Sequence, residues 1–255
     1  MRITFLGTGT SQGIPIIGSN HPVCQSDDPR DKRLRSSVLV QWNNCAVVID
    51  CGPDFRQQML RHPISKLDAI LFTHEHSDHT AGIDDIRPFF FRQGNISIYA
   101  IPRVINDLTQ RFGYILNSSN KYPGAPSVEI HPIIDTDKPF SVCKQLFMPL
   151  VGQHNLIEVL GFRVESFAYI TDIKTISKDE IQKLNNLDVL VLNALRKKEH
   201  HSHLNLDEAI KLAQQIGAKT TYLTHISHHL GFYLEVEQSL PKNVHLAYDN
   251  LTIKI

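Results

Sequence analysis

The sequence predicts a layered α/β fold for one domain that spans residues 1–255. Strand-like segments dominate the first half of the chain, and the second half alternates strands with helices, an order typical of α/β domains. No internal repeat, low-complexity tract or linker interrupts this pattern. With 255 residues, of which 42% are hydrophobic and 20% charged, the chain can bury a substantial core without covalent crosslinks.

Apolar runs that end at turn residues predict the strands. Asn43 and Asn44 separate two such runs, which indicates a hairpin, and a buried run ends at His74. The predicted strands cover residues 2–7, 36–42, 45–52, 67–74, 96–101, 128–133, 144–152, 161–172, 187–195 and 219–225, with two short strands in 244–255 around Asp249 and Asn250.

Capping residues and amphipathic spacing predict the helices. Ser177 with Glu180, and Asn205 with Glu208, have the three-residue spacing of a capping box, and Gly217 follows the last turn of the second helix. Helices are predicted over residues 53–62, 86–93, 102–116, 177–186 and 205–218, and the Pro-, Gly- and Ser-containing stretch 118–127 is predicted to be a loop.

Charge and cysteine content exclude several classes of protein. Lys+Arg and Asp+Glu both number 26, so no global basic field favours nucleic acid. No apolar run approaches the roughly 18 residues of a membrane span, and the N-terminal run is too short for a signal-peptide core. The cysteines show no disulfide framework, so a cytoplasmic protein with unpaired thiols is expected, at Cys24, Cys45, Cys51 and Cys143.

The stretch "LFTHEHSDHTAG", residues 71–82, carries the strongest functional signal. Its His74, His76, Asp78 and His79 directly follow a predicted strand, and imidazole and carboxylate groups are the ligands that zinc and related metals prefer. His74 and His76 can point the same way on an extended backbone, whereas Asp78 and His79 lie further round the loop. The pattern therefore favours a metal site over an ordinary polar surface loop, and a site for two metals over a site for one.

This H-x-H-x-D-H pattern resembles that of the metallo-β-lactamase superfamily. The resemblance implies a four-layer αββα sandwich with the metals at one edge of its two sheets. It also implies three later ligands and one aspartate that orients the metal loop, here His154 in "PLVGQHN", Asp172 in "SFAYITD", His225 in "TYLTHISH" and Asp50 in "VIDCG". Taken alone, His154 is more typical of an ordinary loop and Asp172 of a helix cap.

The implied ligands divide between two ions. One ion takes His74, His76 and His154, the other takes Asp78, His79 and His225, and Asp172 bridges the two. Zinc and manganese both suit this set.

Stretches at both ends of the chain resemble one branch of the superfamily, the PhnP-like phosphodiesterases, which are related to ribonuclease Z. The matching stretches are "FLGTGTSQGIP", "DPRDKRLRSS", "LTHISHH" and "YDNLTI". The long tRNA-gripping arm of ribonuclease Z has no counterpart, and with zero net charge a nucleic-acid partner is not expected. A membrane partner is not expected either. The protein could form a homodimer, and the sequence leaves this question open.

The implied activity is hydrolysis of a small or cyclic phosphodiester, such as a cyclic ribose phosphate or a 2′,3′-cyclic nucleotide, by a metal-bridging hydroxide. The alternatives are ribonuclease Z-like or exonuclease cleavage of RNA, and thioester or lactam hydrolysis.

The branch places a histidine near the scissile phosphate, before the clearest helix. Among His200, His201 and His203, the spacing to the helix favours His203. It would donate a proton to the leaving oxygen or stabilise charge in the transition state. Asp78 is expected to serve catalysis as well as metal binding, and a solvated loop is the alternative for His203.

PhnP-like proteins also tend to carry a structural zinc. The matching positions are His21, Cys24 and His228, but Ser19 stands where a fourth ligand is expected. Three interpretations stay open: zinc with water or another side chain as fourth ligand, a site held by packing instead, or ordinary loop residues. His229 is expected to have a surface or packing role, and Arg33 and Arg35 either contact phosphate or serve the structure.

Overall fold

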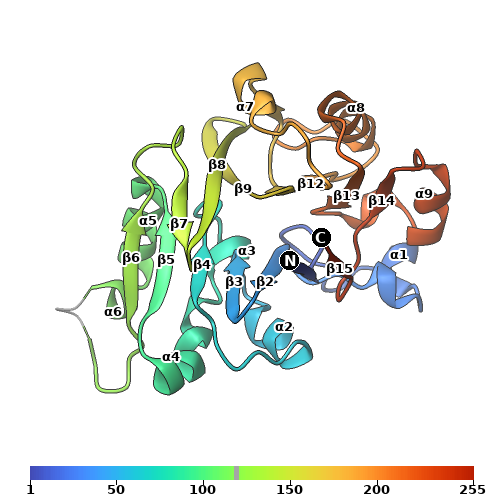
Figure 1. Cartoon of the computed structure of the whole chain (residues 1–255). Coiled ribbons are helices and arrows are strands. Elements are labelled where there is room, and N and C mark those ends of the chain that lie inside the picture. The colour runs from blue at the N-terminus through green and yellow to red at the C-terminus, as the bar shows by residue number, and fades with distance from the viewer. Residues whose placement is uncertain (118–120) are drawn as a thin grey trace.

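The computed structural model describes residues 1–117 and 121–255, so part of the predicted loop over 118–127 lies outside the described residues. Its strands form two sheets (Figure 1). Neighbouring strands of the first sheet are, in order, β15 (Thr252–Lys254), β1 (Arg2–Gly7), β2 (Ser37–Trp42), β3 (Cys45–Ile49), β4 (Ala69–Leu71), β5 (Ile96–Ala100) and β6 (Val128–Pro132). Those of the second are β11 (Thr175–Ile176), β8 (Gln145–His154), β9 (Ile157–Val164), β10 (Phe167–Ile170), β12 (Val189–Asn193), β13 (Thr220–Thr224) and β14 (Val244–Leu246), while β7 (Phe140–Val142) pairs with β8.

The helices are short, and α2, α4, α5, α8 and α9 lie on the outer faces of the two sheets (Figure 1). They are α1 (Pro22–Gln25), α2 (Phe55–Arg61), α3 (Ser77–Thr80), α4 (Arg87–Gln93), α5 (Pro102–Arg111), α6 (Gly113–Leu116), α7 (Lys178–Gln182), α8 (Leu206–Ile216) and α9 (Tyr233–Ser239), with 3-10 turns η1 (Pro29–Asp31), η2 (Ile83–Ile86) and η4 (His228–Leu230). No helix in the described ranges is long and apolar enough to cross a membrane.

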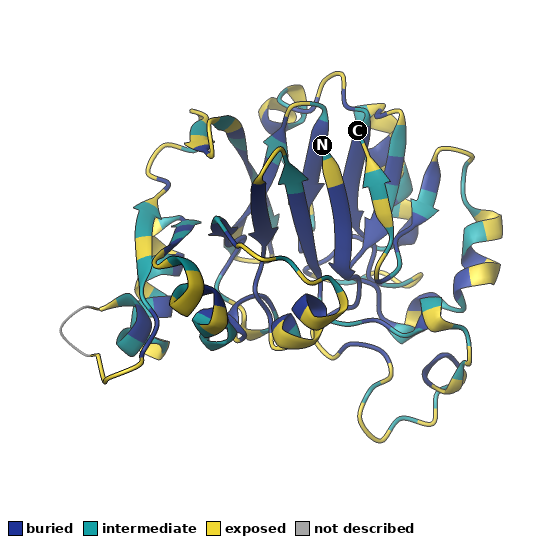
Figure 2. Cartoon of the chain, turned by 60° about the horizontal axis from the view of Figure 1, so that its bottom comes forward, coloured by how far each residue is buried: buried dark blue, intermediate teal, exposed yellow. Residues whose placement is uncertain are grey.

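Three apolar clusters separate four layers. Strand β3 shows how one strand serves two of them: Val47 and Ile49 face the second sheet, whereas Ala46 and Val48 face the helices. The inner cluster joins both sheets through residues such as Phe5, Val47, Phe162 and Val191. The outer clusters pack α2, α4 and α5 on the first sheet and α8 and α9 on the second. Figure 2 shows the buried positions concentrated in the central strands. This arrangement confirms the predicted αββα sandwich.

Most predicted elements are confirmed, with differences at their ends, but the strand predicted over 161–172 is wrong: β9 and β10 are antiparallel and the chain turns between them at residues 165 and 166. Asn205 and Glu208 form the predicted capping box of α8, and Gly217 ends the helix in the left-handed conformation at φ 71°. The predicted helix over 102–116 is divided at Phe112 into α5 and α6. Strands β7 and β11 and helices α1, α3 and α9 were not predicted.

The capping box predicted for α7 is half wrong. Ser177 accepts the backbone N–H of Glu180 as expected. The Glu180 carboxylate instead accepts the backbone N–H of Val151 at 2.9 Å and pairs with Lys183 at 2.7 Å. The Glu180 carboxylate, which the local pattern assigned to the start of α7, therefore bonds to β8 instead.

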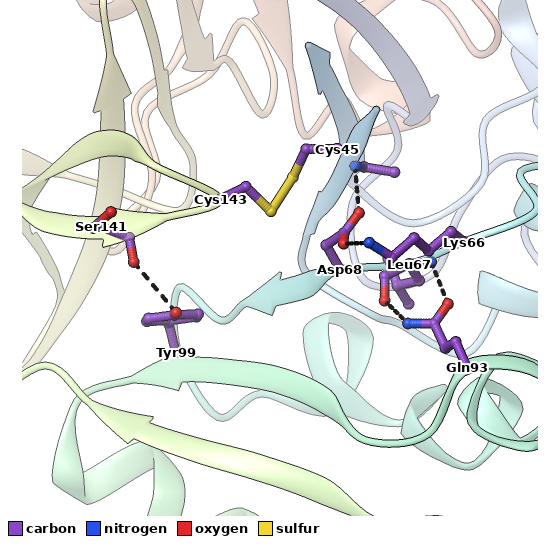
Figure 3. The surroundings of a disulfide bond; sticks show 9 residues. Cys45, Lys66, Leu67, Asp68, Gln93, Tyr99, Ser141 and Cys143 are labelled. Carbon is purple, nitrogen blue, oxygen red and sulfur yellow. Dashed lines mark hydrogen bonds and ion pairs between the residues drawn. A yellow bond between two sulfur atoms is a disulfide. The ribbon is translucent and has the colours of Figure 1, made fainter. Parts of the chain in front are cut away.

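The expectation of unpaired thiols is wrong for two of the four cysteines. Cys45, at the start of β3, forms a disulfide with Cys143, in the turn between β7 and β8 (Figure 3). The bond joins the first sheet to the second, and Asp68 lies beside it and accepts the backbone N–H of Ala46 at 3.0 Å. Cys24 and Cys51 are free and buried, as expected.

Reduction of this disulfide is expected to lower the melting temperature by roughly 10–15 °C, because it closes a long loop in the unfolded chain. The two cysteines are 98 residues apart in sequence. Thermal melts with and without a non-chelating reductant measure the shift. The Cys45→Ser/Cys143→Ser variant should melt at the lower temperature under both conditions, and equal melts of the unsubstituted protein would contradict the prediction.

Candidate metal centre

The predicted ligands meet at one edge of both sheets because several strands end there. In the first sheet, β3 and β4 run parallel and lead to Asp50 and to His74. In the second sheet, β10, β12 and β13 run parallel, and β10 and β13 lead to Asp172 and His225. Carboxyl ends of parallel strands share an edge, where open α/β sheets usually hold their sites. Strand β8 runs antiparallel to β9, and β9 to β10, so His154 ends at the same edge.

Three of these residues have a left-handed backbone one or two positions after the end of a strand. The φ angles are 65° at Asp50, 60° at Asp172 and 56° at His225. This conformation is uncommon for residues with a side chain and is often found at functional sites. It turns the chain sharply, so that the side chain that follows the strand points into the space between the sheets' ends.

Asp172 lies at the middle of the histidines. Its Oδ2 atom is 3.3 Å from His79 Nε2 and 3.1 Å from His225 Nδ1, and its Oδ1 is 3.7 Å from His203 Nδ1. Asp78 Oδ2 lies 3.2 Å from the same His79 nitrogen. The two carboxylates therefore approach His79 together, and Asp172 also contacts the later histidines.

Four buried ring nitrogens of this cluster have no hydrogen-bond partner among the described residues. They are His74 Nε2, His79 Nε2, His203 Nδ1 and His225 Nδ1. Three of them lie within 4 Å of a carboxylate oxygen without forming a hydrogen bond to it. Buried polar atoms without partners are costly, so lone pairs that converge on one space fit cations held between them. The residues present therefore fit divalent metal ions.

Ligand atoms of the cluster fall into three overlapping groups, each with all atoms within 4.8 Å. The groups are His74 with His79 and Asp172; Asp78 with His79 and His225; and His154 with Asp172 and His203. The second group is the trio predicted for one ion. His76 is in none of them, although its ring lies 4.5 Å from that of His74 and 5.2 Å from that of His154.

Hydrogen bonds on the outer side fix the ring orientations. Asp50 Oδ2 accepts from His79 Nδ1 at 2.7 Å, which leaves the Nε2 lone pair to face the cluster. His154 Nδ1 lies 3.0 Å from the carbonyl of Ser202, and His74 Nδ1 lies 2.9 Å from the Thr73 hydroxyl. Asp50, which the resemblance assigned to the orientation of the metal loop, contacts His79 and Thr73 of that region. The role of Thr73 was not predicted, although a polar residue at the end of the apolar run "AILF" could have indicated it.

Two arginines of α5 bond to the loop of residues 74–79 and to Thr80 beside it. Arg103 pairs with the Glu75 carboxylate and donates to the backbone carbonyl of Glu158 in β9 at 2.6 Å. Arg111 donates to the Glu75 carbonyl at 2.7 Å and to the Thr80 hydroxyl at 2.9 Å. Arg103 thus connects the loop to the β8–β9 hairpin that carries His154. No sequence signal marks this role.

Burial and charge act in opposite directions on these groups. Burial lowers the pKa of His79, but the carboxylates of Asp78, Asp172 and Asp50 outweigh it and the pKa is raised. Burial raises the pKa of Asp172, but the surrounding histidines bring it well below its usual range. Burial dominates at His203 and lowers its pKa to about 3.

The second predicted metal position is less well assembled. The rings of His21 and His228 lie 4.7 Å apart, and His228 Nδ1 is buried without a partner in the described chain. Cys24, however, packs against Ile14 and Val23 and does not join a group of three close ligand atoms among the described residues. The structural zinc stays a prediction.

Neighbouring side chains have local structural contacts. Ser19 Oγ accepts from the backbone N–H of His21 at 3.2 Å, and the His229 ring lies 3.9 Å from that of His228. Arg33 is buried and donates to Thr8 and to the Ala247 carbonyl, at 2.7 and 2.6 Å, so its contacts are structural. Arg35 pairs with Asp54 at 3.0 Å.

Comparison with known proteins agrees with this geometry. The profile described as Beta-lactamase superfamily domain matches residues 46–226. The chain belongs to the metallo-β-lactamase superfamily. Its fold and its convergent histidines and carboxylates are those of a metal-dependent hydrolase of this superfamily.

Three proteins of known name are similar to this chain. A crystal structure of a diphosphatase from the PhnP family has 39% identity and a TM-score of 0.92, covering 100% of this chain and 97% of that one. An octanoyltransferase of Porphyromonas gingivalis is 39% identical over 253 residues, 98% of this chain but 51% of that protein. The chain thus spans about half the length of this relative. A ribonuclease Z of Mycobacterium sp. (strain KMS) is 24% identical over 83% of each chain.

Proposed function

We propose that residues 1–255 form one hydrolase domain with two divalent metal ions, which cleaves a small or cyclic phosphodiester. The observation that carries the proposal is the convergence of four unpartnered, buried imidazole nitrogens on Asp78 and Asp172. The similarity to a PhnP-family diphosphatase supports phosphate as the reacting group.

The chain's own residues divide the work as follows. His74, His76 and His154 would hold one ion, Asp78, His79 and His225 would hold the other, and Asp172 would serve both. Bound zinc or manganese ions would acidify the attacking water and neutralise charge on the phosphoryl oxygens. The tautomer of His79, fixed by Asp50, presents its Nε2 lone pair, and the Ser202 carbonyl orients His154 in the same way.

His203 is proposed to contact the phosphoryl group. Its ring lies between those of His154 and His225, with centroids at 4.5 and 4.9 Å. Its side chain is 11% exposed, so it borders the proposed ligands and still contacts solvent. A hydrogen bond from its imidazole to a phosphoryl or leaving oxygen would strengthen as charge develops in the transition state.

A single substrate panel tests the proposal. Purified protein loaded with zinc or manganese is assayed on bis-p-nitrophenyl phosphate, a 2′,3′-cyclic nucleotide, precursor tRNA and an octanoyl thioester. Cleavage of the small phosphodiesters is expected. Preference for precursor tRNA would favour the second candidate, a ribonuclease, which the similarity to ribonuclease Z supports. Cleavage of the thioester alone would refute both.

The His203→Ala variant is expected to cleave bis-p-nitrophenyl phosphate about 10²- to 10³-fold more slowly with unchanged metal content. His201→Ala, on the same segment but exposed, is the matched control and should retain activity. Metal per chain and kcat/KM are measured on the same samples. Because His203 shares a close group with His154 and Asp172, a loss of metal would identify it as a ligand instead.

A further inference from the structure

A separate group of possible metal ligands lies at the disulfide, at the end of β3 opposite to Asp50. The sulfur atoms of Cys45 and Cys143 and a carboxylate oxygen of Asp68 all lie within 4.8 Å of one another (Figure 3). Thiolates and carboxylates are ligands of zinc, and a pair of thiolates favours zinc over magnesium or calcium. The mechanism proposed above uses none of these three residues.

Cys143 occupies a backbone position that seldom carries a cysteine. The turn between β7 and β8 is formed by Cys143 and Lys144, whose φ angles are 47° and 67°. Hairpin turns with two positive φ angles usually contain Asn, Asp or Gly, because other residues are disfavoured there. Residues in such conformations cluster at functional sites, where the surrounding structure holds them. The turn itself therefore does not explain the cysteine, and its contacts with Cys45 and Asp68 do.

Hydrogen bonds hold Asp68 in place beside the two sulfur atoms. Its backbone N–H donates to the Ala46 carbonyl at 2.8 Å, and its carboxylate accepts the Ala46 N–H at 3.0 Å. The side chain of Gln93 accepts from the N–H of Leu67 at 2.9 Å and donates to the Leu67 carbonyl at 2.5 Å (Figure 3). These bonds fix the segment that leads into β4. The carboxylate is therefore positioned before any ion arrives.

Lys66 provides the charge that a metal at this position needs. Its ammonium group pairs with the Asp68 carboxylate. A dication bound by two thiolates and one carboxylate has an excess of one negative charge, and the ammonium group cancels it. Charges that are shielded from water are tolerated when they are balanced in this way.

Solvent reaches this group of residues. Cys143 is exposed, whereas Cys45 is buried. A hollow of about 390 Å³ has Cys45 and Lys66 in its lining, together with the turn residues Asn43 and Asn44. A small reductant and a metal ion therefore both have a route to the sulfur atoms.

We propose that Cys45, Cys143 and Asp68 bind a zinc ion when the disulfide is reduced, with water as the fourth ligand. A dithiol reductant opens the bond by exchange: it gives two electrons and two protons to the sulfur pair and becomes a disulfide itself. Zinc then replaces the two thiol protons. At Zn–S distances of about 2.3 Å, a tetrahedral ion holds the sulfur atoms about 3.8 Å apart, a separation that the exposed turn at Cys143 can supply. The two sheets stay joined, by the disulfide when oxidised and by zinc when reduced.

Titration with cobalt(II) tests the inference, because thiolate ligands give cobalt a strong near-ultraviolet charge-transfer band that histidine and carboxylate ligands do not. The catalytic centre is first loaded with zinc, and the disulfide is reduced with a phosphine in the absence of oxygen. The reduced protein should develop the band and saturate at one cobalt ion per chain. The disulfide form should show no band. Cys45→Ser/Cys143→Ser should show none either, although it keeps the thiols of Cys24 and Cys51.

Asp68→Asn tests the carboxylate separately. In the reduced protein this variant should bind cobalt at least about tenfold more weakly than the unsubstituted chain. Asp207→Asn, which removes an exposed carboxylate on α8, is the control and should not change the affinity. In the disulfide form Asp68→Asn should leave the metal content unchanged, because the sulfur atoms are then bonded to each other. Equal cobalt affinity of reduced Asp68→Asn and the unsubstituted chain would overturn the role of Asp68 as a ligand.

Thermal stability gives a second readout. Zinc added to the reduced protein, with its catalytic centre already loaded, should raise the melting temperature by about 5 °C. The disulfide form and Cys45→Ser/Cys143→Ser should show no such rise. Complete reduction is verified by titrating the four thiols of the denatured chain. Fully reduced protein with neither a cobalt band nor a zinc-dependent rise would overturn the inference, and so would a band that persists in the double serine variant.

Discussion

Replacing Asp172 with alanine is expected to reduce phosphodiesterase activity by about 10³-fold or more and to remove at least one metal ion per chain. Asp172 contacts His79 and His225 through one oxygen, at 3.3 and 3.1 Å, and approaches His203 with the other at 3.7 Å. No other carboxylate is this close to all three rings in the described residues. Its loss leaves three imidazoles facing a space that lacks the negative charge needed to hold two dications together.

Metal content by mass spectrometry and kcat/KM on bis-p-nitrophenyl phosphate check this prediction on the same preparation. Asp188→Ala is the matched control, because Asp188 precedes β12 at the opposite end of the second sheet and pairs with Ser166 and Lys219 there. The control should keep both metal and activity. Full metal occupancy in Asp172→Ala would show that Asp172 is not a shared ligand.

Local patterns predicted much of this protein because local physics determines those parts. The capping box of α8 depends on Asn205 and Glu208, three residues apart, and any chain with this pairing tends to start a helix there. The spacing from His74 to His79 likewise places four candidate ligand side chains on one loop after a strand. The superfamily resemblance then supplied the four-layer sandwich, which the three apolar clusters confirm.

Long-range contacts could not be predicted in this way. The disulfide joins Cys45 and Cys143 across 98 residues, and no local signal links them. Glu180 has the right spacing for a cap, but a backbone N–H of β8 competes for its carboxylate. The left-handed backbone at Asp172 is also invisible in sequence, since glycine rather than aspartate usually takes that conformation.

The Asp50→Ala variant is expected to lose both stability and metal affinity, whereas Asp50→Asn is expected to lose mainly metal affinity. Asp50 is fully buried, and its oxygens accept from the N–H of Thr73 at 2.9 Å, from the Thr73 hydroxyl at 2.9 and 3.1 Å, and from His79 Nδ1 at 2.7 Å. Alanine leaves these buried donors without an acceptor, so we expect the free energy of unfolding to fall by about 3 kcal/mol or more. Metal affinity should fall by about 10- to 100-fold.

Asparagine keeps the shape of Asp50 and one acceptor, so its cost in stability should be smaller. With its oxygen accepting from Thr73, however, its NH₂ group faces Nδ1 of His79, which must then become the acceptor. The ring proton moves to Nε2, and His79 loses the lone pair that faces Asp78 and Asp172. Asp50→Asn should therefore remain folded in urea titrations yet bind metal as weakly as Asp50→Ala. Asp68→Asn, which replaces a carboxylate beside the disulfide, should bind metal normally. A strong metal site in Asp50→Asn would mean that charge balance, and not the tautomer of His79, is what Asp50 supplies.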